Sequence, residues 1–146
     1  MAREYVDVCF DDVEVGMEIP SIRFPLTPQK LAIFAGVNRD FNPIHINTER
    51  ARQDGAKDMD SNAMLLMALF ERMLREWAGL SAKIRKIGPY RMKKFTCAGN
   101  ELLVRGVVES KEIDEENNKK VVLNVTVETK DDGITVEGKA TIYLAK

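Results

Sequence analysis

The only histidine of the chain, His45, follows Asp40 by five residues in the segment Asp40-Phe-Asn-Pro-Ile-His45. An imidazole takes up and releases protons near neutral pH, and a neighbouring carboxylate can take part in that transfer. Proline stiffens the turn between the two residues. The spacing therefore predicts an acid/base pair. A structural interpretation competes with it, because Asn or Asp before proline favours turns and a single histidine is more often structural than catalytic.

The neighbouring elements favour the catalytic interpretation. Thr27-Pro28 supplies an N-cap and a first-turn proline for a helix that is expected to run to about Asn38. A short second helix is expected over Thr48–Asp54, closed by Gly55. The Asp/His segment thus lies in the irregular connection between two helices, where functional groups are concentrated.

A long helix is predicted over Ser61–Ala78, and its stretch Ala63–Phe70 is entirely apolar. A helix that is apolar on every side is expected to be buried on every side. The unpaired N–H groups at its start can stabilise a developing oxyanion. The apolar stretch is far below the roughly 20 residues that a membrane span needs.

The C-terminal half alternates apolar and polar residues with the period of two that is typical of half-buried strands. The expected strands are Ile84–Phe95, Glu101–Val108, Val121–Glu128 and Ile134–Leu144. A hairpin loop is expected over Lys111–Lys120, and a turn at Asp131–Gly133. These elements predict the α+β class, with an antiparallel sheet wrapped around one long buried helix.

The length, charge and cysteine spacing of the chain limit the classes of function that are expected. At 146 residues the chain is expected to form a single domain over residues 1–146. Lys and Arg total 22 against 23 acidic residues, so nucleic acid and anionic membranes are not expected partners. Cys9 and Cys97 show no disulfide or zinc spacing, and the polar N-terminus indicates no signal peptide. We therefore expect a soluble, cytoplasmic protein without a metal.

The stretch from Phe34 to His45 resembles the hydratase motif of the MaoC-like, (R)-specific enoyl-CoA hydratases, Asp-x-Asn-Pro-Ile/Leu-His. Gly55-Ala-Lys57-Asp58, Asn62 and the run from Trp77 to Gly88 are similar to the small subunit of actinobacterial steroid side-chain enoyl-CoA hydratases. The resemblance covers about residues 33–88 and implies the hot-dog fold. It agrees with the independent prediction from the order of elements.

The resemblance also implies roles. Asp40 and His45 would activate the water that adds across the 2,3-double bond of an enoyl-CoA. The backbone N–H of Ala63 would bind the thioester oxygen, although this chain has Asn62-Ala63 where the family generally has His-Gly. Further candidate substrate contacts are Asn42, Asn62 and Lys57. No separate cofactor is expected, because coenzyme A is part of the substrate.

Several alternatives stay open. The resemblance implies a bulky, steroid-like acyl group, and a homodimer or a heteromer with a second MaoC-like subunit. A hot-dog thioesterase would use Asp58 or Asp60, and a non-catalytic acyl-CoA-binding subunit would use the Asp/His pair only as a brace. Basic side chains either contact the phosphates of coenzyme A or lie on an exposed strand face; they are Lys57, Arg85, Lys86, Arg91, Lys93 and Lys94.

Overall fold

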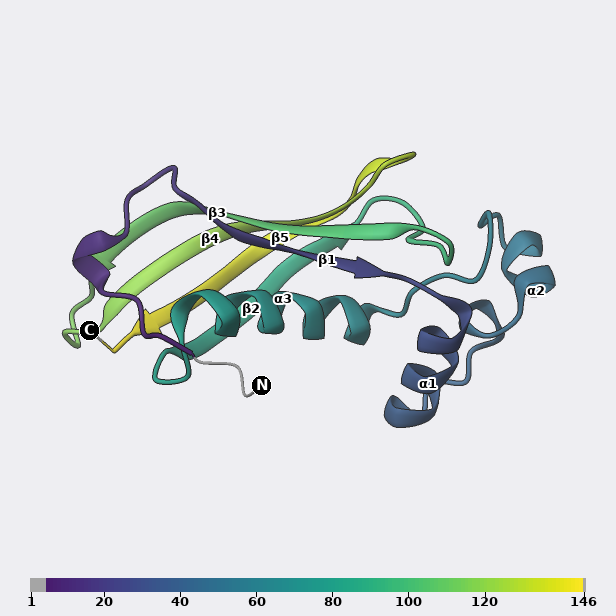
Figure 1. Cartoon of the computed structure of the whole chain (residues 1–146), viewed down its shortest axis with the longest axis horizontal. Helices are drawn as coiled ribbons and strands as arrows, with labels where there is room; N and C mark the ends of the chain where they lie inside the picture. Colours follow the sequence, from purple (N-terminus) through teal and green to yellow (C-terminus); the bar gives the residue numbers. More distant parts are fainter. Residues whose placement is uncertain (1–4, 146) are drawn as a thin grey trace.

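The computed structural model describes residues 5–145, and its centre is a five-stranded antiparallel sheet (Figure 1). The sheet order is β1-β3-β4-β5-β2. The strands are β1 (Glu18–Pro25), β2 (Lys83–Met92), β3 (Glu101–Ile113), β4 (Lys119–Thr129) and β5 (Gly133–Leu144). The helices are α1 (Pro28–Asn38), α2 (Thr48–Gln53) and α3 (Ala63–Ala78), with 3-10 turns at Phe10–Asp12 and Pro43–His45. The first four residues, on which the expectation about a signal peptide partly rests, lie outside the described residues.

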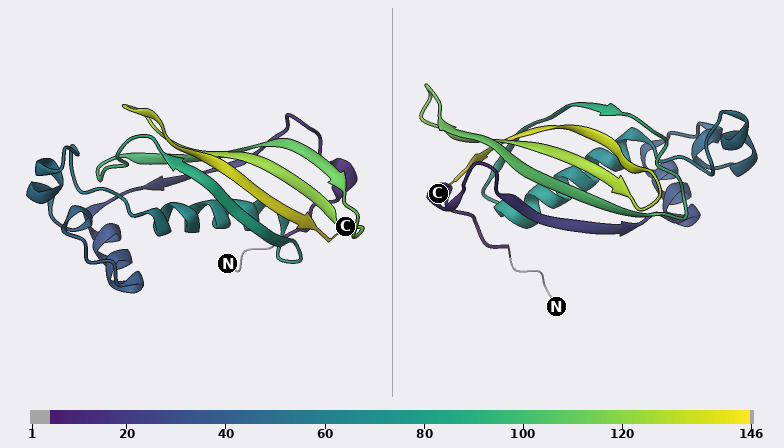
Figure 2. Two further views of the ribbon diagram at one scale, coloured as in Figure 1. Left: turned by 180° about the vertical axis from the view of Figure 1, so that it is seen from behind. Right: turned by 90° about the horizontal axis from the view of Figure 1, so that it is seen from above.

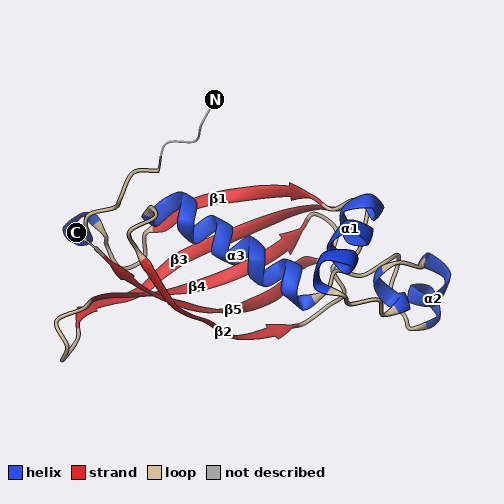
Figure 3. Cartoon of the chain, turned by 90° about the horizontal axis from the view of Figure 1, so that it is seen from below, coloured by secondary structure: helices blue, strands red, loops and turns tan. Residues whose placement is uncertain are grey.

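The long helix α3 packs against one face of the curved sheet, and the core lies between them (Figure 3). Alternate residues of β4, including Leu123 and Val125, are buried, as their period of two predicts. From α3, Leu66, Phe70 and Met73 are fully buried. The predicted α+β architecture, a sheet wrapped around one long helix, is confirmed.

The expectation that α3 is buried on every side is wrong. Met64 is 54% exposed, and Ala68, one turn further on, is also exposed. The sheet covers one side of the helix, and Figure 3 shows no other described helix or strand across the opposite side. The apolar start of α3 therefore presents a hydrophobic face to the surroundings of this chain.

The expected hairpin loop over Lys111–Lys120 is also too long. β3 continues to Ile113 and β4 begins at Lys119, so the connection is only residues 114–118. The Asp114 carboxylate closes this turn by accepting hydrogen bonds from the backbone N–H groups of Glu116 (3.0 Å) and Asn118 (2.8 Å). Charged side chains that suggested a loop face each other across the extended strands, as in the 2.7 Å ion pair of Lys120 with Glu112.

The helices α1 and α2 extend beyond one end of the sheet, on the side where α3 begins (Figures 1 and 2). The predicted N-cap of α1 is confirmed, because the Thr27 hydroxyl accepts a hydrogen bond from the N–H of Lys30 and Pro28 is the first helical residue. β2 ends at Met92, earlier than the expected Phe95. The chain then passes beside the residues before α3, where the N–H of Ser61 donates to the carbonyl of Thr96 over 2.9 Å.

Within residues 5–145, no helix combines the length and the apolar character that crossing a membrane requires.

Candidate active site

The side chains of Asp40 and His45 meet at this end of the molecule, with Nε2 of His45 3.3 Å from Oδ2 of Asp40. α1 stops at Arg39, whose left-handed φ of 59° turns the chain away from the helix axis. The N–H of Asp40 donates to the carbonyl of Ala35 over 3.0 Å. Oδ1 of Asp40 accepts from the N–H of Asn42, which leaves Oδ2 directed at the imidazole.

The motif residues between the pair build the turn. The Asn42 side-chain oxygen accepts a hydrogen bond from the N–H of Ile44 (3.3 Å), and Pro43 begins the 3-10 turn. The N–H of His45 donates to the Asn42 carbonyl over 3.0 Å. Asn42 thus caps the turn that brings His45 back to Asp40. Asn42, for which the resemblance implies a substrate contact, thus also has a structural function in the turn.

The hydrogen-bond partner of His45 assigns its tautomer. Nδ1 lies 2.8 Å from the backbone carbonyl of Asp60, which can only accept a hydrogen bond, so Nδ1 carries the proton. In the neutral ring, Nε2 is then a free acceptor facing Asp40. The imidazole is 12% exposed and the carboxylate 39% exposed, so the open side of the pair faces solvent. One water molecule can donate to both acceptors.

Asp60 connects three segments of the site. Its N–H donates to the carbonyl of Ile44 (3.0 Å), its own carbonyl holds His45, and its Oδ1 accepts a hydrogen bond from the N–H of Thr96 (2.7 Å). The residue is only 6% exposed. Burial raises the pKa of the Asp60 carboxyl above its ordinary value, while the Thr96 N–H and the charge of His45 act in the opposite direction.

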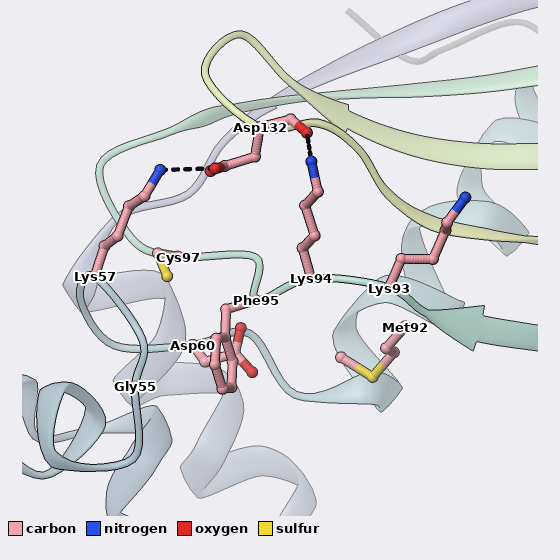
Figure 4. A pocket seen from close by; sticks show the side chains of 9 residues that line it. All are labelled: Gly55, Lys57, Asp60, Met92, Lys93, Lys94, Phe95, Cys97 and Asp132. Atoms are coloured by element: carbon pink, nitrogen blue, oxygen red, sulfur yellow. Dashed lines mark hydrogen bonds and ion pairs between the residues drawn. The ribbon is translucent and has the colours of Figure 1, made fainter.

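A pocket of about 600 Å³ opens beside Asp60 (Figure 4). The residues that line it are Gly55, Lys57, Asp60, Met92, Lys93, Lys94, Phe95, Cys97 and Asp132. Asp40, His45, Asn62 and Ala63 are not among them. The pocket therefore adjoins the Asp/His pair through Asp60, whose side chain lies in the pocket and whose carbonyl binds the imidazole.

Two lysines at the pocket converge on Asp132 in the β4–β5 turn (Figure 4). Nζ of Lys57 lies 2.7 Å from the Asp132 carboxylate, and Lys94 donates to the Asp132 backbone carbonyl. The hydrogen bond and the charge of Asp132 raise the pKa of Lys57 above its ordinary value. Lys93 pairs with Glu137 over 3.2 Å. The other residues of the expected basic rim do not line this pocket; they are Arg85, Lys86 and Arg91.

Asn62 and Ala63 form the start of α3. Oδ1 of Asn62 accepts a hydrogen bond from the N–H of Leu65 over 2.9 Å, so Asn62 is the N-cap. Ala63 is the first helical residue, and its N–H has no acceptor within the helix. Asn62 is 5% exposed, which makes the cap a buried part of the framework.

We expect Asn62→Ala to lower the free energy of unfolding by about 0.5–2 kcal/mol, because the mutation leaves the buried N–H of Leu65 without its acceptor. Urea denaturation followed by circular dichroism measures the change. Asn62→Ser, which keeps a capping oxygen, is the matched control and should lose less. Equal losses in both variants would mean that the cap contributes little.

The sequence did not identify the pocket walls. The sequence predicts Met92 and Phe95 only as parts of one strand, and Cys97 only as a free thiol. Their shared position arises because the chain leaves β2 after Met92 and pairs at Cys97 with Asp60 in an isolated bridge. The sequence indicates Asp60 only as a possible thioesterase carboxylate. Its position two residues before the helix cap was the one local signal available.

The chain is similar to known proteins in both sequence and fold. The family model for the MaoC like domain matches residues 13–131. The beta subunit of 3-oxo-4,17-pregnadiene-20-carboxyl-CoA hydratase from Mycobacterium tuberculosis is 32% identical over 74 residues, which are 51% of this chain and 57% of that protein. The alignment thus spans little more than half of this relative.

Solved structures show the same fold. A chain of the ChsH1-ChsH2 complex from Mycobacterium tuberculosis matches with a TM-score of 0.80 and 24% identity, over 90% of this chain and 98% of that one. The R-hydratase PhaJ1 from Pseudomonas aeruginosa matches with a TM-score of 0.81 and 22% identity, over 94% of this chain and 86% of that one. The (R)-hydratase from A. caviae matches with a TM-score of 0.79 and 23% identity, over 91% of this chain and 98% of that one. The predicted hot-dog fold is confirmed.

Proposed function

Because this chain belongs to the MaoC-like domain family, we propose that it is an enoyl-CoA hydratase in which Asp40 and His45 activate water. The observation that carries the proposal is the 3.3 Å approach of the His45 Nε2 to the Asp40 carboxylate. The Asp60 carbonyl holds the proton of His45 on Nδ1, which leaves Nε2 ready to accept another. An unprotonated imidazole nitrogen beside a carboxylate is suited to removing a proton from water.

In the proposed reaction, water donates one O–H to Nε2 of His45 and the other to Asp40. As His45 takes a proton, the oxygen bonds to the β-carbon and the double-bond electrons move toward the thioester. The thioester oxygen gains negative charge, which the N–H of Ala63 at the start of α3 stabilises. A proton then passes from the Asp/His pair to the α-carbon, so that one water has been added in total.

The substrate proposed is a bulky enoyl-CoA, of the steroid side-chain type. The name of the mycobacterial relative supports this class. A pocket of about 600 Å³ with walls from Met92, Phe95 and Cys97 offers apolar contact for such a group. Lys57 at the same pocket is the proposed contact for a phosphate of coenzyme A, which would compete with Asp132 for its ammonium group.

Thioester hydrolysis is the second candidate, and one observation favours it. Asp60 places a buried carboxyl at the pocket just before α3, where a hot-dog thioesterase would need it. The carboxylate of Asp58, the other thioesterase candidate, accepts hydrogen bonds from the Thr48 hydroxyl and from the N–H of Met59, both at 2.7 Å. Hydration ranks first because it uses both Asp40 and His45.

Absorbance of the enoyl-thioester band separates these functions. Hydration removes the band without releasing free thiol, thioester hydrolysis releases coenzyme A, and a binding subunit does neither. The assay is run with the purified protein alone and with a second MaoC-like subunit. Loss of the band with no free thiol is the expected result, whereas failure with every enoyl-CoA in both settings would reject the proposal.

We also propose that the chain works as a homodimer or as a heteromer with a second MaoC-like subunit. Both edges of the sheet, β1 and β2, pair on one side only among the described strands. Large apolar side chains are exposed near the site, including Ile33 (67%), Val37 (74%) and Phe41 (62%). The similarity to a chain of the ChsH1-ChsH2 complex supports the heteromer in particular.

Sedimentation velocity tests this assembly. We expect either a dimer of the purified chain or a complex after mixing with a MaoC-like partner, with hydratase activity appearing in the assembled fraction. A stable monomer that is fully active would contradict the proposal.

A further inference from the structure

Asp132, in the β4–β5 turn, is the residue at which two lysines of the pocket meet (Figure 4). Nζ of Lys57, from the connection between α2 and α3, lies 2.7 Å from its carboxylate. Lys94, which follows β2, donates to its backbone carbonyl. Three segments that are far apart in the sequence are thus joined at one residue, and both ammonium groups lie within hydrogen-bond reach of it.

The turn around Asp132 does not depend on its carboxylate. The backbone N–H of Asp132 donates to the Thr129 hydroxyl over 3.1 Å, and the backbone carbonyl accepts from Lys94. Thr129 and Gly133 continue the pairing of β4 with β5 at the base of the turn. An asparagine could keep all of these contacts. Among the described contacts, the negative charge of Asp132 is therefore used only by Lys57.

The positive charges of the two lysines are available to a ligand. The Lys57 side chain is 69% exposed, and an ion pair that is open to solvent contributes little free energy, so it is broken at low cost. The acceptor of Lys94 is a neutral carbonyl, and Lys94 forms no ion pair with a carboxylate of residues 5–145. A terminal phosphate carries more negative charge than a carboxylate and can accept hydrogen bonds from both lysines.

We propose that Lys57 and Lys94 together form a phosphate-binding site, in which the Asp132 carboxylate competes with the ligand. Asp132 is then a specificity-determining residue, because it favours ligand groups that carry more negative charge than its own carboxylate. The inference rests on the proposed function, in which the phosphate belongs to coenzyme A. Lys93, the third lysine of the pocket, pairs with Glu137 over 3.2 Å and stays outside this site.

Calorimetric titration of coenzyme A into the assembled protein measures this competition without any hydration. Asp132→Asn removes the competing charge and keeps the backbone contacts of the turn. Coenzyme A should then bind about two- to fivefold more tightly, the range expected when an exposed ion pair no longer has to be broken. Asp131→Asn is the matched control, because Asp131 is exposed in the same turn and forms no ion pair within the described part of the chain. Its Kd should stay within about 1.5-fold of wild type, since solvent and salt screen its charge.

The lysine variants show whether the gain depends on these two side chains. Lys57→Met and Lys94→Met should each weaken the binding of coenzyme A, and Asp132→Asn should have a smaller effect in the Lys57→Met background than in the wild type. Titration with 3′-dephospho-coenzyme A identifies the phosphate. The gain from Asp132→Asn disappears with this ligand if the site binds the 3′-phosphate, and it persists if the site binds the diphosphate.

A folded Asp132→Asn protein that binds coenzyme A no more tightly than wild type would overturn the proposal, as would the absence of binding to both proteins. If that variant does not fold, Lys94→Met decides, because it leaves the ion pair of Lys57 with Asp132 in place; unchanged affinity would overturn the proposal. The outcome is separate from that of the hydration assay. A protein without hydratase activity can still show the competition, and an active hydratase can lack it.

Discussion

Replacing His45 with alanine, or Asp40 with asparagine, is expected to lower hydration turnover by at least about 10²-fold while the protein stays folded. His45→Ala removes the only imidazole nitrogen that can take the proton of water. Asp40→Asn preserves the size of the side chain but replaces the acceptor charge at Oδ2, 3.3 Å from Nε2. Turnover is measured by loss of the enoyl-thioester band, and folding by thermal unfolding of each variant.

A matched control is Asp54→Asn, which removes a carboxylate on the same end of the molecule that is paired with Arg50. It should retain nearly full activity. A fall in melting temperature that parallels the fall in activity in the Asp40 and His45 variants would instead favour the structural interpretation of the pair.

The second large effect is expected from Ala63→Pro, which removes the proposed oxyanion donor and little else. Ala63 is the first residue of α3, a position where proline is favoured because its missing N–H has no helical acceptor. Asn62 has φ of −78° and ψ of 155°, which suits a residue before proline. We expect kcat to fall about 10²–10³-fold, the usual cost of one oxyanion donor.

Ala63→Gly is the control, because it keeps the N–H and removes only the methyl group; its activity should stay close to wild type. Urea denaturation verifies that the proline variant is as stable as the parent protein. If Ala63→Pro is stable and fully active, the thioester oxygen binds elsewhere.

Local spacing was sufficient to predict that Asp40 and His45 lie together, but not which distant residues hold His45 in place. Asp40, Asn42 and His45 lie within one turn, and the structure brings the two ends of that turn together through short-range hydrogen bonds. Asp60 contacts His45, which lies fifteen residues earlier in the sequence, and Thr96, which lies thirty-six residues later. Contacts of that separation depend on how β2 and α3 pack, which no local pattern encodes.

The fold class followed from periodicity, because alternating strands and a long apolar helix leave few ways to bury their surfaces. The exposure of Met64 was missed for a physical reason: an apolar pattern shows that a helix face avoids water but not what covers it. Within one chain the sheet covers only one side of α3. The remaining apolar face is consistent with the proposed association with a second subunit.

The most direct test of the central claim compares the double variant, Asp40→Asn with His45→Ala, against each single variant in the enoyl-CoA hydration assay. Since both groups are proposed to act on one water molecule, the double variant should be no slower than the slower single variant, within about threefold. Losses that multiply in the double variant would show that the two residues act independently and would contradict the account.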